Sequence, residues 1–76
     1  MSYCRFISKC EDGSLSDVWC YTTADTVWVV KLAEGAPRLD WTFDSAAETA
    51  DWLDLLKADG IHVPQYAIDR LREEAD

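Results

Sequence analysis

The stretch Asp17-Val18-Trp19-Cys20-Tyr21-Thr22-Thr23, followed by Thr26-Val27-Trp28-Val29-Val30-Lys31-Leu32, decides the fold of this 76-residue chain. Both runs are rich in aromatic and β-branched residues, which fit a pleated sheet. Little more than Ala24-Asp25 separates them, so a tight hairpin is predicted although the turn lacks the preferred Asn-Gly. The sequence therefore predicts two paired antiparallel strands, at about residues 17–23 and 26–33.

Two further strands are expected on either side of this hairpin. Residues 3–9 form a plausible first strand, which the turn-forming cluster Glu11-Asp12-Gly13-Ser14 closes. In residues 38–43, Leu39, Trp41 and Phe43 alternate with polar residues, the period of a half-buried strand. The expected sheet is an antiparallel meander of three to four strands.

The next segment carries the signals of a helix over about residues 46–59. Ser45 and Glu48 form a capping box, which satisfies free backbone N–H groups at a helix start. Gly60 and Ile61 are placed for a Schellman stop. Apolar and small residues recur at helical spacing and predict one buried stripe, made of Ala46, Thr49, Ala50, Trp52, Leu53 and Leu56.

A second helix is predicted over about residues 64–75. Pro64 is tolerated in the first turn of a helix, and Ala67, Ile68 and Leu71 share one face. A chain of this length builds one small core. We therefore expect a single α+β domain over residues 1–76, with an antiparallel sheet and two C-terminal helices packed on one of its faces.

Composition excludes several classes of function. Fifteen acidic residues against seven basic ones give a net charge of −8, which disfavours direct binding to a nucleic-acid backbone. The chain opens with no signal-peptide pattern and contains no apolar run long enough to cross a membrane. We expect a cytoplasmic protein that binds neither a membrane nor nucleic acid directly.

The cysteines predict reduced thiols rather than a disulfide framework, because three is an odd number in a chain without a signal peptide. Cys4, Cys10, Cys20 and His62 are ligand types for zinc. Their spacings of five, nine and forty-one residues match no zinc knuckle, so no metal site and no cofactor are expected.

Catalytic residues are not expected either. His62 is the only histidine, and it lies between Ile61 and Val63 in the predicted interhelical turn. No motif such as G-x-S-x-G brings a nucleophile near it. The sequence therefore indicates a protein that is not an enzyme.

The acidic residues of the first helix are the main candidate for a partner-binding site. Asp44 and Glu48 are explained by the helix start, where negative charge is favoured. Asp51, Asp54 and Asp59 have no such explanation, because Asp is a mediocre helix former and opposes the helix dipole near the C-terminus. The spacing predicts a line of carboxylates along one helical face. This line either imitates a phosphate backbone or is a solvated face that keeps the protein dispersed.

The tryptophans suggest a second candidate surface. Three of the four are expected in or against the core: Trp28, Trp41 and Trp52. Trp19 and Tyr21 share one face of their strand, and Val18 and Cys20 share the other. If the aliphatic face meets the helices, Trp19 and Tyr21 form an exposed aromatic patch that could anchor a protein partner. The sequence does not decide between the two registers.

Both ends of the chain resemble a group of small proteins encoded by bacteriophages and prophages. The opening Met1-Ser2-Tyr3-Cys4-Arg5-Phe6 with Ser16-Asp17-Val18-Trp19-Cys20-Tyr21 carries this resemblance, as does Ala58-Asp59-Gly60-Ile61-His62-Val63-Pro64 with the later Ala67, Leu71 and Glu74. The run Val27-Trp28-Val29-Val30 departs from the Gly- and Thr-rich segment of that group. In size and charge the chain is also similar to anti-CRISPR and antirestriction proteins, several of which mimic DNA.

These observations lead to two functional expectations. The first is a phage-derived acidic inhibitor that binds a basic nucleic-acid-binding host protein or complex through Asp44, Glu48, Asp51, Asp54 and Asp59. The alternative is a structural or accessory phage protein that self-associates, as a homodimer, through Trp19 and Tyr21.

Overall fold

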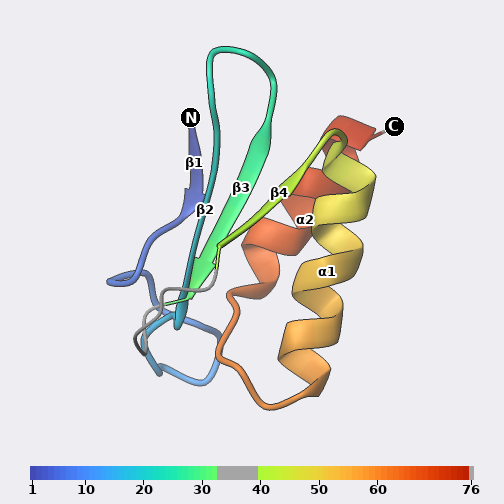
Figure 1. Cartoon of the computed structure of the whole chain (residues 1–76). Helices are drawn as coiled ribbons and strands as arrows, with labels where there is room; N and C mark the ends of the chain where they lie inside the picture. Colours follow the sequence, from blue (N-terminus) through green and yellow to red (C-terminus); the bar gives the residue numbers. More distant parts are fainter. Residues whose placement is uncertain (33–39, 76) are drawn as a thin grey trace.

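A computed structural model describes residues 1–32 and 40–75 of the chain. The four strands are β1 (Ser2–Cys4), β2 (Val18–Thr22), β3 (Trp28–Leu32) and β4 (Asp40–Phe43), and the helices are α1 (Ala46–Ala58) and α2 (Gln65–Ala75). The strands form one antiparallel sheet in the order β1-β2-β3-β4. Both helices lie side by side on one face of this sheet (Figure 1). The α+β arrangement, with a meander followed by two helices, is confirmed.

The central hairpin pairs as expected, from Val18 opposite Leu32 to Thr22 opposite Trp28. Its turn differs from the expected two-residue loop. The Thr23 N–H donates to the Val27 carbonyl (2.9 Å), and the Thr26 N–H donates to the Thr23 carbonyl (3.1 Å), so three residues form the loop. Such loops need a left-handed third residue, usually glycine. Here Thr26 takes that conformation, with φ of +58°, because no glycine is available.

The first strand is much shorter than the expected residues 3–9. β1 ends at Cys4, and the chain then turns: the Arg5 N–H donates to the Ser8 hydroxyl (2.9 Å), and the Ser8 N–H donates to the Arg5 carbonyl (3.0 Å). A serine hydroxyl that bonds nearby backbone offers the chain an alternative to a strand ladder. The other strands are also shorter at their ends, and residues 33, 38 and 39 of the expected strands lie outside the described residues.

The helix boundaries follow the local signals. The Ser45 hydroxyl accepts from the Glu48 N–H (3.2 Å), which makes Ser45 the N-cap of α1. At the other end Gly60 has φ of +96°, and the Ile61 N–H donates to the Leu56 carbonyl (3.0 Å) as in a Schellman motif. α1 ends one residue earlier than expected, and α2 begins one residue later.

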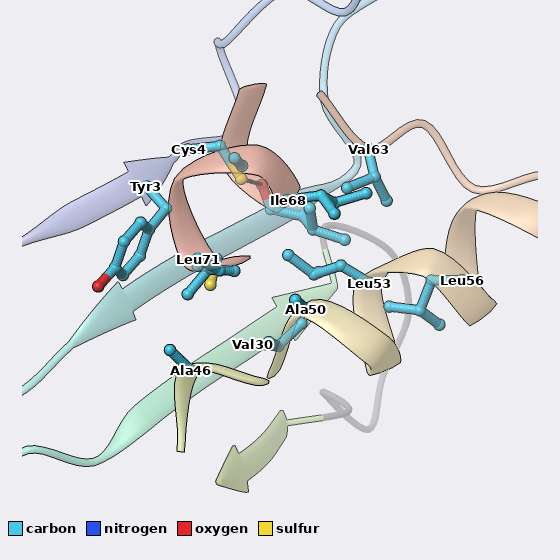
Figure 2. Close-up of a cluster of buried hydrophobic side chains, with 13 residues drawn as sticks. Tyr3, Cys4, Val30, Ala46, Ala50, Leu53, Leu56, Val63, Ile68 and Leu71 are labelled. Atoms are coloured by element: carbon cyan, nitrogen blue, oxygen red, sulfur yellow. Dashed lines mark hydrogen bonds between the residues drawn. The ribbon is translucent and has the colours of Figure 1, made fainter. Parts of the chain in front are cut away.

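The core lies between the helices and the sheet face that they cover (Figure 2). Every second residue of β2 and β3 points into it, so Val18, Cys20 and Val30 are fully buried. The helices contribute the expected stripes, including Leu53 from α1 and Ile68 from α2. Around this centre, partly buried rings pack against the core as expected for Trp28, Trp41 and Trp52.

Candidate functional site

The five acidic residues that the sequence singled out lie on α1 or next to its two ends. Asp44, Glu48, Asp51 and Asp59 are exposed, and Asp54 is half-buried. The buried residues of α1 lie on its opposite side, against the sheet and α2. At 100° per residue, positions 48, 51 and 54 fall within one arc of the helix surface. We call these five residues the acidic face.

Negative charge is concentrated in the helical half of the chain. Residues 44–76 contain nine acidic and three basic residues, whereas residues 1–43 contain six and four. Six of the eight net negative charges therefore belong to the segment that builds the helices. Because the core side of both helices is apolar, the charged side chains stand on their outer surface.

Arg72 of α2 interrupts the acidic face. Its Nη1 lies 3.2 Å from Asp51 Oδ1, and its Nη2 contacts Asp54 Oδ2. Hydrogen bonds to Asp54, and then to Asp51, raise the pKa of Arg72. The predicted line of carboxylates is therefore partly neutralised at Asp51 and Asp54, which share one cation and keep one net negative charge between them.

The remaining acidic positions have no ion-pair partner among the described residues. Within residues 1–32 and 40–75, no Lys, Arg or His side chain lies within ion-pair distance of Asp44, Glu48 or Asp59. Asp44 and Glu48 lie at the start of α1, and Asp59 is its C-cap residue. The acidic face therefore has a strongly negative N-terminal end and a partly neutralised middle.

An exposed leucine that the sequence analysis missed lies within the acidic face. Leu55 is 62% exposed and falls at nearly the same angle around α1 as Glu48 and Asp51. Its neighbours one turn away along the helix include Asp51 and Asp59, so an exposed apolar side chain lies between two acidic ones at this point of the surface. The sequence could have indicated this leucine, because position 55 lies outside the apolar stripe that ends at Leu56. The core therefore does not require a leucine there.

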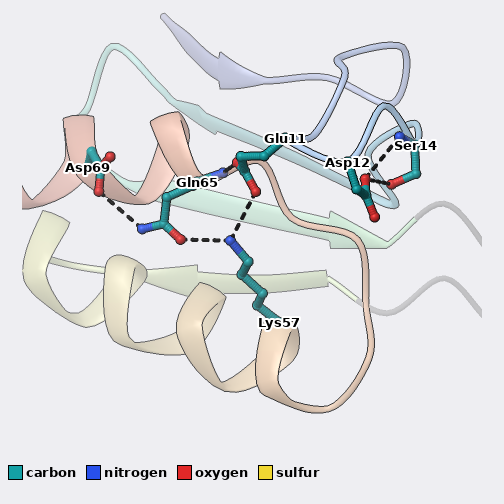
Figure 3. Close-up of polar contacts among 6 residues, drawn as sticks. All are labelled: Glu11, Asp12, Ser14, Lys57, Gln65 and Asp69. Atoms are coloured by element: carbon teal, nitrogen blue, oxygen red, sulfur yellow. Dashed lines mark hydrogen bonds and ion pairs between the residues drawn. The ribbon is translucent and has the colours of Figure 1, made fainter.

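A polar network joins the loop after β1 to both helices (Figure 3). Lys57 Nζ lies 3.3 Å from Glu11 Oε2 and donates to Gln65 Oε1 (2.7 Å), and Gln65 Nε2 donates to Asp69 Oδ1 (3.1 Å). Glu11 also accepts from the Gln65 N–H at the first turn of α2, which is the main cause of its lowered pKa. These contacts hold α2 in place, so we assign Lys57 and Glu11 to stability.

Cys10 and His62 line a hollow of about 290 Å³ beside this network. Asp17 Oδ2 accepts from the His62 N–H (3.0 Å) and lies 3.1 Å from His62 Nδ1, so the imidazole is fixed. Burial is the main cause of the raised pKa of Cys10, and the negative charges of Asp12 and Glu11 also raise it. Because the thiolate is the reactive form of a cysteine, this rise in pKa makes the Cys10 thiol less nucleophilic.

The other two cysteines lie in the core, where they pack as small apolar side chains. Burial raises the pKa of Cys4, and it raises that of Cys20 to about 12. In the described part of the chain, no three His, Cys, Asp or Glu side chains converge as a metal site requires. Cys4 and Cys20 are separated from Cys10 and His62, which line the hollow outside the core.

The structure also decides the register of β2. Val18 and Cys20 face the helices, so Trp19 and Tyr21 lie on the opposite face of the sheet. Their rings are 5.0 Å apart, and the ring of Phe6 stands edge-on to Trp19 at 6.0 Å. Ile7 beside them is 79% exposed, and a hollow of about 240 Å³ opens between this loop and Trp19. We call Phe6, Ile7, Trp19 and Tyr21 the open-face patch.

Comparisons with protein-family models, with curated proteins and with solved structures each gave no match. The resemblance of the two chain ends to bacteriophage proteins therefore stays a prediction. Among the described residues, neither helix is long and apolar enough to cross a membrane.

Proposed function

We propose that this protein is a phage-derived, non-catalytic inhibitor that acts in the cytoplasm of a bacterial host. Its acidic face docks on the basic groove of a nucleic-acid-handling defence protein and occupies the place of the phosphate backbone. The observation that carries this proposal is the concentration of six of the eight net negative charges in the helical segment, in which Leu55 is exposed on the outer surface of α1.

The arrangement of charges suits such a role. Asp44 and Glu48 supply two negative charges at one end of α1 that no described residue neutralises. Leu55 supplies an apolar contact that a partner can desolvate, which gives affinity beyond long-range attraction. Charges of this kind steer a basic partner towards the face and lose their effect as salt screens them.

The proposal is tested by capture from bacterial lysate at low salt, followed by competition. We expect a basic nucleic-acid-binding protein to be retained, to be released by moderate salt, and to be displaced by duplex DNA, because DNA and this protein would share one site. Displacement by DNA is the decisive observation, since a partner bound elsewhere would be retained.

Matched substitutions locate the contact. Glu48→Gln keeps the backbone N–H that Ser45 caps and removes one charge from the acidic face. It should weaken capture about threefold, the size expected of one exposed charge. Asp25→Asn removes the same charge from the β2–β3 turn and should leave capture unchanged. Equal effects of the two variants, or no displacement by DNA, would reject the proposal.

A further inference from the structure

We propose that the open-face patch is the interface of a symmetric homodimer, in which the sheets of two copies of this chain meet face to face and the helices point outward. This interaction uses the surface opposite the acidic face and does not depend on the function proposed above. The inference rests on three properties of the patch: its side chains, its charge balance and its size.

The side chains are those of an interface centre. Phe6, Trp19 and Tyr21 form a continuous row of tilted and edge-on rings. Ile7 projects beside them into solvent, and the hollow between them is of a size to receive an apolar side chain. Aromatic residues with an apolar neighbour dominate binding energy at protein interfaces, and in a twofold contact each row meets its own copy.

The charge balance favours a second copy over a foreign protein as the occupant. Two molecules with a net charge of −8 repel each other most strongly where that charge is concentrated, on the helices. On the open face Lys31 Nζ lies 3.8 Å from Asp40 Oδ2 and 6.0 Å from the ring of Trp19, and Arg5, which lines the hollow with Phe6, Ile7 and Trp19, adds one positive charge, so this face lacks the excess of acid found on the helices. Face-to-face pairing of the sheets keeps the two acidic layers apart.

The open face is large enough for a dimer interface of standard size. The molecule measures 28 × 28 × 20 Å, and a layer of sheet under a layer of helices has its broad dimensions along the layers. A standard interface takes about 800 Å² from each partner. The broad side of this molecule, 28 by 28 Å, supplies an area of that order.

The experiment is sedimentation equilibrium of the full chain between about 1 µM and about 1 mM, at low and high salt. We expect a reversible monomer–dimer equilibrium that persists at high salt, because apolar contacts are not screened. Ile7→Lys places a charge at the most exposed point of the patch and should raise the dimer dissociation constant at least about tenfold. Circular dichroism confirms that the variant is folded, which is expected because Ile7 lies outside the core.

Leu55→Lys is the matched control, since it makes the same change at an exposed apolar residue on the helical side. It should leave the dimer unchanged and weaken capture of the basic partner, whereas Ile7→Lys should do the reverse. A monomer at every concentration would overturn the inference. A dimer that Leu55→Lys weakens as much as Ile7→Lys, or that dissociates in high salt, would overturn it as well.

Discussion

The two faces of the sheet have the same strands and opposite roles. On the covered face, Val18, Cys20 and Val30 are fully buried under two helices. On the open face, Trp19 and Tyr21 are half-buried and lean on a loop rather than on a helix. The covered face therefore supplies most of the folding free energy, whereas the open face and the outer helix surface are the two surfaces that we propose as binding sites. Apolar content alone does not distinguish them, because both faces of β2 are apolar.

The largest expected difference is in stability, and it is measured by removing one side chain from each face. Leu53→Ala removes a fully buried side chain from the covered side and should lower the free energy of unfolding by about 3 kcal/mol. Ile7→Ala removes a side chain of equal size that is 79% exposed and should change the free energy by less than about 0.5 kcal/mol. Urea denaturation measures both values. Similar losses for the two variants would contradict the assignment of faces.

A second effect separates the faces by pH. Burial on the covered face raises the pKa of Cys20 from 9.0 to about 12. As the pH rises, the unfolded state therefore loses the thiol proton before the folded state does. The contribution is fully present below pH 9 and is lost as pH rises towards 12, at about 1.4 kcal/mol per pH unit. Cys20→Ala should flatten the fall in stability over this range.

Residual alkaline loss is expected in that variant, because burial also raises the pKa values of Cys4 and Tyr3. Cys10→Ala is the control, since Cys10 lies outside the core and should contribute less. The measurement is urea denaturation at several pH values. An unchanged pH slope after Cys20→Ala would show that the covered face is open to water around this thiol.

The features that the sequence predicted are those with local causes. The Ser45 cap, the Gly60 stop and the pairing of β2 with β3 each depend on neighbouring residues, and each is present. The prediction of a strand over residues 3–9 was wrong beyond Cys4, because the Ser8 hydroxyl bonds to nearby backbone and favours a turn. The β-propensities of the residues do not include this competing hydrogen bond.

The parts of the site that the sequence missed depend on contacts between distant residues. Arg72 bridges Asp51 and Asp54 across two helices, and Glu11 binds the first turn of α2 from 54 residues away. Helical spacing placed the acidic residues on one face of α1 but could not show which cation from α2 would reach them. Likewise, alternation along β2 separated Trp19 from Val18 without showing which face the helices would cover.

In the function that we propose, the local negative charge of the helical surface, and not the net charge of the molecule, binds the basic partner. Arg72→Gln frees Asp51 and Asp54, and Lys9→Gln removes one positive charge from the loop after β1, where Lys9 pairs with no acid among the described residues. Both variants have the same net charge. In low-salt capture of the DNA-displaceable partner, the account predicts about threefold tighter binding by Arg72→Gln and no comparable change for Lys9→Gln. Equal tightening by both variants, or weaker binding by Arg72→Gln, would contradict it.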